Sequence, residues 1–156
     1  MTDYGLLCKQ AESLAEGNKW DITLLANISA LLYENLEEIN WVGFYLLHNN
    51  ELLLGPFQGK TACTCIPKGK GVCGTAVEEN RIICVDDVHS FPGHIACDSA
   101  SASEIVLPIC YKEQIIGVLD IDSPVKGRFS TEDETGLKEI VKIIEESLTG
   151  DTVGQK

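Results

Sequence analysis

EIVLPICYKEQIIGVLDID, residues 104–122, carries the clearest structural signal in the chain. Two apolar runs, Glu104 to Cys110 and Gln114 to Ile121, flank the polar triplet Tyr111-Lys112-Glu113, an arrangement typical of a β-hairpin. An earlier pair of apolar runs repeats the arrangement around a His-Asn-Asn turn, namely Asn40 to Leu47 and Glu51 to Gly55. Two hairpins of this kind predict a central sheet that is largely antiparallel.

Helical spacing of apolar residues marks both ends of the chain. The segments Asp3 to Ala15 and Trp20 to Leu36 predict two N-terminal helices that pack together. Near the other end, Thr131 and Glu134 form a capping-box pattern ahead of a helix with one apolar face. This order of elements predicts an α+β fold, in which the N- and C-terminal helices cover one face of the central sheet and a ligand pocket lies on the other.

The middle of the chain holds shorter elements and one long loop. Strands are expected at Cys63 to Ile66 and Arg81 to Val85, and a short helix is expected at Gly71 to Glu79. The loop from Asp86 to Ser103 exceeds the usual ~4–6 residues of a connection, and loops of that length are commonly functional. It contains three side chains suited to a site, Phe91, His94 and Cys97.

The size and charge of the chain limit its possible domain organisation and partners. Its 156 residues, 44% of them hydrophobic, predict one domain over residues 1–149 and a polar tail at 150–156. A formal net charge of −12 disfavours nucleic acid and anionic membranes as partners, whereas small or cationic ligands remain suitable. No apolar run approaches the ~20 residues of a membrane span, and the N-terminus lacks the pattern of a signal peptide. We therefore expect a cytoplasmic protein.

Seven cysteines are unusual for a chain of this length. Their odd number, without a secretory signal, argues against a permanent disulfide framework and leaves catalysis, redox exchange or metal binding open. Cys97, among small residues in the long loop, is a candidate reactive thiol. Three others fall in apolar patterns that predict buried, inert thiols: Cys8, Cys84 and Cys110. A zinc site is an open alternative, built from Cys63, Cys65, Cys73, His94 and Cys97.

Acidic and aromatic residues mark a second candidate site. Asp120 and Asp122 lie two residues apart at the end of an apolar strand, so both should face the same side of the sheet. Glu104, at the start of the preceding strand, is expected near them. Like charges so close together require a cationic ligand or a carboxyl group that stays protonated, unless both are simply solvated. On the earlier hairpin, Trp41 and Tyr45 share a face and predict an aromatic wall.

The glycine-rich segment Gly69-Lys70-Gly71-Val72-Cys73-Gly74 has the spacing of a dinucleotide-binding turn. That turn requires a preceding core strand, but Pro67 intervenes. We therefore interpret these glycines as a tight turn into the short helix.

Several motifs together resemble one family. They are INWVGFY at 39–45, GKGVCGT at 69–75, GHIACD at 93–98, SEIV at 103–106 and GVLDID at 117–122. In order and separation they closely resemble the free methionine-R-sulfoxide reductases, which are GAF-domain proteins. The resemblance spans almost the whole chain and implies a GAF-like fold. It also implies reduction of free L-methionine (R)-S-oxide to L-methionine, with thioredoxin as electron donor and neither a cofactor nor a metal.

The resemblance also assigns roles to individual residues. The family's three redox cysteines correspond to Cys63, Cys73 and Cys97. Its substrate-binding residues correspond to Glu104, Asp120, Asp122, Trp41 and Tyr45. Cys97 is assigned as the attacking thiol and Cys63 as the residue that forms a disulfide with it, while attack by Cys73 stays open. A non-catalytic GAF sensor that binds a small molecule is the alternative function, and the oligomeric state, a homodimer included, stays open.

Overall fold

The computed structural model describes residues 1–95 and 99–152. Within these residues six strands form one sheet, and every neighbouring pair is antiparallel. The strands are β1 (Trp41–His48), β2 (Glu51–Gly59), β3 (Cys65–Pro67), β4 (Ile83–Val85), β5 (Ser103–Tyr111) and β6 (Gln114–Ser123). Their order across the sheet is β3-β2-β1-β6-β5-β4, so the two predicted hairpins meet at the central β1/β6 pair.

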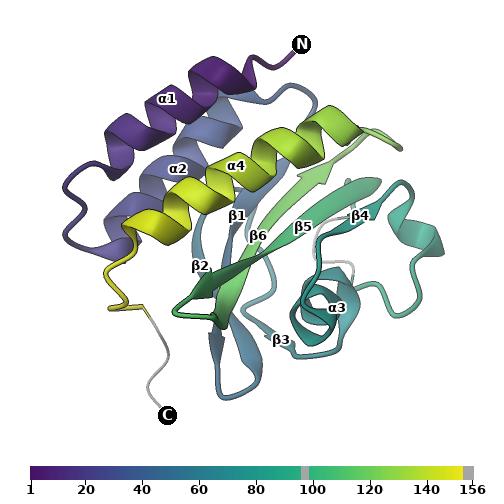
Figure 1. Cartoon of the computed structure of the whole chain (residues 1–156). Helices are drawn as coiled ribbons and strands as arrows, with labels where there is room; N and C mark the ends of the chain where they lie inside the picture. The colour runs from purple at the N-terminus through teal and green to yellow at the C-terminus, as the bar shows by residue number, and fades with distance from the viewer. Residues whose placement is uncertain (96–98, 153–156) are drawn as a thin grey trace.

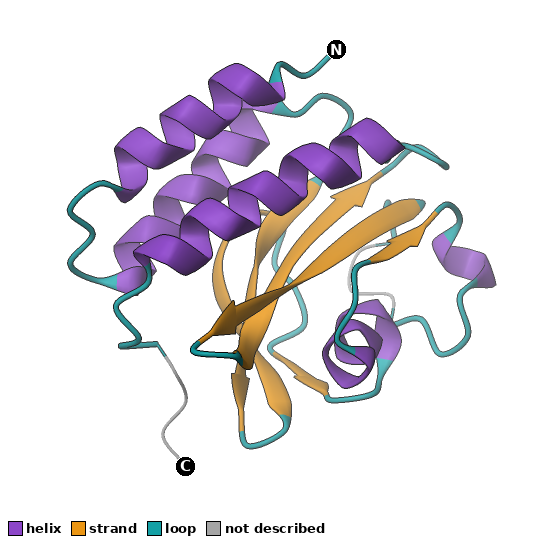
Figure 2. Ribbon diagram, in the orientation of Figure 1, coloured by secondary structure: helices purple, strands orange, loops and turns teal. Residues whose placement is uncertain are grey.

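Helices cover the two faces of the sheet unequally. The helices α1 (Tyr4–Ala15), α2 (Asp21–Asn35) and α4 (Thr131–Ser147) form a layer on one face (Figure 1). The short helix α3 (Gly71–Glu79) lies on the opposite face, as Figure 2 also shows. This arrangement confirms the predicted α+β fold with the terminal helices on one side. No helix within the described residues is long and apolar enough to cross a membrane.

Alternation along the strands divides the core into two parts. On β1, Val42, Phe44 and Leu46 pack against the helix layer. Trp41 and Tyr45, which alternate with them, belong to a second cluster on the α3 side. Successive strand residues point to opposite faces, so one strand supplies both clusters. The larger cluster holds the terminal helices on the sheet, and the smaller one surrounds the candidate site.

Strand β2 is longer than expected because a bulge accommodates its proline. The pairing of β1 with β2 shifts register between Gly43, opposite Phe57, and Tyr45, opposite Leu54. At this shift two residues of β2, Gly55 and Pro56, stand opposite the single residue Phe44, and Pro56 has no N–H to donate to a ladder. The strand therefore continues to Gly59 instead of ending at Gly55.

The cap of α4 lies one residue earlier than predicted. Ser130 Oγ accepts a hydrogen bond from the Asp133 N–H at 3.2 Å, and the Asp133 carboxylate accepts one from the Ser130 N–H at 2.8 Å. Tyr4 Oη and Arg128 Nη1 also donate to this carboxylate, at 2.7 and 2.9 Å. The Thr131/Glu134 pair was therefore the wrong choice, because these tertiary partners select Asp133.

The predicted burial of Cys84 is also wrong. Its strand β4 is three residues long and forms the edge of the sheet, and the Cys84 side chain is exposed. Cys8 and Cys110 are half-buried. The loop after β4 contains a single 3₁₀ turn at Val88–Ser90.

The segment after α4 is held to the start of α2 by a buried carboxylate. The backbone N–H groups of Thr149 and Gly150 donate to Asp21 Oδ1 and Oδ2 at 2.8 and 2.9 Å. The Asp21 N–H in turn donates to the Asp151 carboxylate at 3.2 Å. These bonds tie the two ends of the helix layer together.

Candidate active site

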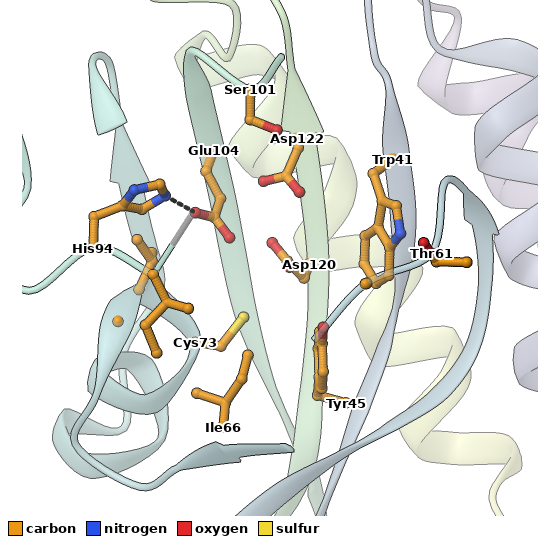
Figure 3. A pocket seen from close by; sticks show the side chains of 14 residues that line it. Trp41, Tyr45, Thr61, Ile66, Cys73, His94, Ser101, Glu104, Asp120 and Asp122 are labelled. Atoms are coloured by element: carbon orange, nitrogen blue, oxygen red, sulfur yellow. Dashed lines mark ion pairs between the residues drawn. The ribbon is translucent and has the colours of Figure 1, made fainter. Parts of the chain in front are cut away.

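A pocket of about 520 Å³, its open mouth included, lies on the α3 face of the sheet. Figure 3 shows side chains from β1, β5, β6, α3 and the adjoining loops pointing into it. Six of the eight predicted site residues line it: Trp41, Tyr45, Cys73, Glu104, Asp120 and Asp122. The structure thus brings the acids, the aromatic wall and one cysteine to a single place, while their roles stay predictions.

The three carboxyl groups meet because of strand register. Glu104 on β5 pairs directly with Asp122 on β6, and Asp120 follows two residues away on the same face. Glu104 is only 6% exposed and Asp120 only 5% exposed. Burial, followed by the charges of Asp120 and Asp122, raises the pKa of Glu104 well above its ordinary value. The protonated form of Glu104 is therefore more favourable than that of a solvated glutamic acid.

Asp120 lies at the floor of the pocket with one oxygen unsatisfied. Its Oδ1 atom is fully buried and has no hydrogen-bond partner among the described residues. Burial raises the pKa of Asp120, although hydrogen bonds with Glu104 and Cys73 oppose that shift. A buried acceptor without a partner costs about 1–3 kcal/mol, so this oxygen favours a ligand that brings a donor or a positive charge.

The aromatic wall stands on β1, opposite the acids. The Trp41 ring stacks on Tyr45 at 5.9 Å and on Phe57 at 5.3 Å between ring centroids. Trp41 Nε1 donates to the Lys60 carbonyl at 3.1 Å, and Tyr45 Oη donates to the Cys63 carbonyl at 2.9 Å. Because these bonds occupy the polar atoms of both side chains, the apolar ring faces are available to line the pocket. The bond from Tyr45 also holds the segment that carries Cys63 next to the pocket.

Gly43 makes this stacking possible. A Cβ atom at this position would lie 2.8 Å from the Trp41 ring and would collide with Phe57. The absence of a side chain between two aromatic residues on the same face therefore sets the position of the wall.

The three predicted redox cysteines stand in different situations. Cys73, near the start of α3, is buried, and burial together with the charges of Asp120 and Glu104 raises the pKa of its thiol well above the ordinary value. Cys63 is disulfide-bonded and packs against the cluster that surrounds the pocket. Cys97 lies outside the described residues. Cys65 is an exposed free thiol that donates to Glu51 Oε2 at 3.1 Å, away from the pocket.

His94 is a pocket residue that the sequence placed in the long loop and offered only as a possible zinc ligand. Its Nε2 atom lies 3.9 Å from Glu104 Oε1, and both side chains are largely buried. Burial, followed by the charge of His89, lowers the pKa of His94, so the imidazole is neutral at pH 7. The loops also supply Ile95, from the GHIACD motif, and three residues that no motif distinguished: Thr61, Ala62 and Ser101.

The sequence offered two alternative sites, a dinucleotide-binding turn and a zinc site, and the described residues support neither as predicted. The glycine-rich turn enters α3 from β3, an edge strand antiparallel to its neighbour, and a Cβ at Gly74 would lie 2.5 Å from the Pro67 carbonyl. These glycines form a tight turn into α3. A dinucleotide site would instead require a parallel βαβ unit at this position. The predicted zinc set is not found among the described residues, and its member Cys97 lies outside them. Within the described residues, the metal-ligating side chains that converge are instead Cys73, Glu104 and Asp120.

Comparisons with known proteins agree on one family. A sequence model of the GAF domain matches residues 24–148. The free methionine-R-sulfoxide reductase of Escherichia coli K12 is 58% identical over 145 residues, which cover 93% of this chain and 88% of that protein.

Solved structures agree as well. The structure of fRMsr of Staphylococcus aureus in its reduced form is 60% identical, with a TM-score of 0.93 over 96% of this chain and 97% of that one. The free methionine-R-sulfoxide reductase of Neisseria meningitidis, solved in complex with its substrate, is 43% identical, with a TM-score of 0.89 over 92% and 87% of the two chains.

Proposed function

This chain belongs to the free methionine-R-sulfoxide reductase family of GAF-domain proteins, and we propose that it reduces free L-methionine (R)-S-oxide to L-methionine. The relatives above carry this activity in their names. One observation of this molecule supports it most directly. Three carboxyl groups, an aromatic wall and the Cys73 thiol converge in one pocket, whose described lining residues include no lysine or arginine.

The acid cluster suits the amino group of a free amino acid. A substrate α-ammonium would supply the positive charge and the hydrogen-bond donors that Asp120 Oδ1 lacks. A methionine sulfoxide within a peptide chain has a neutral amide at that position and would leave the acids without their counter-charge. The Trp41 and Tyr45 rings offer an apolar surface to the methyl-thioether end of the substrate. Selection of the free amino acid follows from these two contacts.

The proposed chemistry begins with a thiolate at Cys97. It attacks the sulfoxide sulfur while the sulfoxide oxygen takes a proton from the acid cluster, where burial raises the pKa of Glu104. The substrate S–O bond then breaks, and the protonated oxygen ends on the Cys97 sulfur. The substrate sulfur is reduced by two electrons to the thioether, and Cys97 is oxidised by two electrons to a sulfenic acid. Cys63 then attacks the sulfenic sulfur, water leaves and a disulfide forms.

The choice between Cys97 and Cys73 as the attacking residue rests on the ionisation of the thiol. Burial, followed by the charge of Asp120, raises the pKa of the Cys73 thiol well above its ordinary value, so the thiol stays protonated. A protonated thiol is a poor nucleophile, so this environment supports Cys97. Cys63 forms a disulfide in this structure, which is in keeping with a resolving role.

Thioredoxin is the proposed reductant that returns the disulfide to two thiols. Its dithiol is oxidised as the protein is reduced, which closes the cycle without a bound cofactor. Such a partner suits the cytoplasmic location expected from the sequence. A sensor module, the alternative function, would bind the sulfoxide without consuming reductant.

A coupled assay tests this function. The protein is incubated with thioredoxin, thioredoxin reductase and NADPH, and NADPH consumption is followed with three substrates: free methionine-(R)-oxide, the free (S) epimer and a peptide-bound sulfoxide. We expect turnover of the free (R) epimer alone. Comparable rates on the peptide-bound sulfoxide would overturn the role of the acid cluster. Binding without NADPH consumption would favour the sensor.

A further inference from the structure

We propose that the floor of the pocket binds one transition-metal ion of the Zn²⁺ type, with Cys73, Glu104 and Asp120 as its protein ligands. The bound metal would act as a competitive inhibitor instead of a cofactor. The binding site stands on geometry alone, whereas the inhibition rests on the proposed function.

Convergence of the three side chains is the first observation. Cys73 Sγ and one carboxylate oxygen from each of Glu104 and Asp120 lie within 4.8 Å of one another. In Figure 3 these groups point toward a common centre from α3, β5 and β6. With Zn–S near ~2.3 Å and Zn–O near ~2.1 Å, tetrahedral ligand atoms lie roughly 3.5 Å apart. Small side-chain rotations therefore suffice to close the site.

An unsatisfied atom is the second, independent observation. Asp120 is 95% buried, and its Oδ1 has no hydrogen-bond partner among the described residues. The Asp120 side chain points into the pocket between Glu104 and Cys73, where a cation would lie within reach of its carboxylate (Figure 3). A cluster that satisfied all of its own polar groups would not leave this buried oxygen without a donor.

The ligand chemistry selects the class of metal. A thiolate favours Zn²⁺, Co²⁺ and related ions over Mg²⁺ and Ca²⁺, which prefer oxygen ligands alone. Three protein ligands leave a fourth position open toward the mouth of the pocket, where water can bind. His94, 3.9 Å from Glu104, is placed to orient that carboxylate as an outer-shell partner.

The protons balance simply. The metal binds the Cys73 thiolate and the two carboxylates, and the thiol proton and any proton held by the acids leave to solvent. The ion then neutralises the charges proposed to hold the substrate ammonium. Metal and substrate therefore exclude each other.

Cobalt binding tests the site directly. The full-length protein is reduced, freed of reductant and metal, and titrated anaerobically with Co²⁺. We expect one equivalent to produce a thiolate-to-cobalt charge-transfer band in the near ultraviolet, and one equivalent of Zn²⁺ to abolish it. Cys73→Ser should lose the band. Two matched controls outside the pocket, Cys65→Ser and Cys84→Ser, should keep it. A band retained in Cys73→Ser, or no band in the wild type, overturns the proposal.

A second variant tests the site even if Cys73→Ser fails to fold. Asp120→Asn keeps the thiol and the side-chain volume, and it should weaken Co²⁺ binding at least about tenfold while its circular dichroism spectrum stays that of the wild type. An unchanged affinity in this variant overturns the role of Asp120 as a ligand.

The inhibition is measured separately in the coupled assay. Zn²⁺ should raise KM for methionine-(R)-oxide without lowering kcat, once its effect on the thioredoxin system has been measured with another substrate. If the cobalt band is present but no sulfoxide is turned over, the proposed function fails and the metal site stands. If turnover is normal but no band forms, the metal site fails and the function stands.

Discussion

On strand β6, Leu119 and Ile121 lie against the helix layer, whereas the alternating residues Asp120 and Asp122 face the pocket. Strand β5 shows the same division, with Leu107 against the helices and Glu104 in the pocket. Both faces are buried, but one is filled with apolar side chains and the other retains carboxyl groups. The period of two along a strand allows one element to serve stability and function at once.

The two faces of the sheet contribute to the free energy of folding with opposite sign. Apolar burial on the helix side stabilises the fold by roughly 25 cal/mol per Å². Buried like charges on the pocket side destabilise it, because each acid loses hydration and faces its neighbours. Active sites commonly hold such groups at a cost in stability. Substitutions on the two faces should therefore have opposite signatures.

The largest effect is expected at Cys97, whose predicted role lies on the pocket side. Cys97→Ser should abolish even a single turnover, because no other ionised thiol is proposed to reach the substrate sulfur. Cys63→Ser should still release about one methionine per enzyme before cycling stops, since the sulfenic acid can form without its resolving partner. Rapid-quench measurement of methionine separates these outcomes. A burst kept in Cys97→Ser but lost in Cys73→Ser would make Cys73 the attacking residue.

On the helix face, Leu107→Ala is expected to change stability alone. Leu107 is 1% exposed within the apolar cluster, so its truncation should lower the free energy of unfolding by about 2–5 kcal/mol. Urea denaturation checks this value. Because Leu107 faces away from the pocket, kcat/KM per folded molecule should stay within about twofold of the wild type. A tenfold loss in kcat/KM would show that the two faces are not independent.

Local signals in the sequence predicted much of this division. The hairpins follow from apolar runs and polar turns, and the shared face of Asp120 and Asp122 follows from their spacing. Both are properties of a few neighbouring residues. The approach of Glu104 to these acids also followed, since a hairpin across Tyr111-Lys112-Glu113 brings their strands together, whereas its direct pairing with Asp122 is a finding of the structure.

Features that depend on distant packing escaped prediction. The bulge at Pro56, the exposure of Cys84 and the cap at Ser130 depend on which element lies beside them. The approach of His94 to Glu104 joins a loop to a strand ten residues later, and no periodicity encodes it. Cys73 was a possible zinc ligand from the sequence alone, and it gained a redox role only through the family resemblance, because spacing left the roles of the cysteines ambiguous. Loops and cysteines therefore needed information that strand patterns lack.

An intermediate effect is expected for the acids themselves. Asp122→Asn removes a charge at nearly constant volume and should lower kcat/KM at least about tenfold, or ~1.4 kcal/mol of transition-state binding. The free energy of unfolding should not fall, since one of three crowded charges is gone. Glu146→Gln, an exposed acid on α4, is the matched control and should change neither quantity. Wild-type kinetics in Asp122→Asn would mean that its carboxylate is simply solvated.

The smallest effect is a pH dependence of stability that isolates Glu104. Its folded pKa lies well above the ordinary value of 4.5 because of burial, Asp120 and Asp122, and the other titratable groups facing it are Cys73, His94 and Tyr45. Above pH 4.5 the unfolded chain releases the Glu104 proton while the folded protein keeps it. The folded state then binds more protons, so stability falls as pH rises toward the folded pKa.

Glu104→Gln removes this titration and should gain stability relative to the wild type as pH rises. Between pH 5 and pH 6 the difference in unfolding free energy should grow by up to ~1.4 kcal/mol, which is the limit for one proton over one pH unit. Urea denaturation of both proteins under reducing conditions at pH 5, 5.5 and 6 measures it, with Glu146→Gln expected to follow the wild type. A difference that stays flat or shrinks with pH would mean that Glu104 is ionised in the folded protein. The proton proposed for the departing sulfoxide oxygen would then have to come from another group.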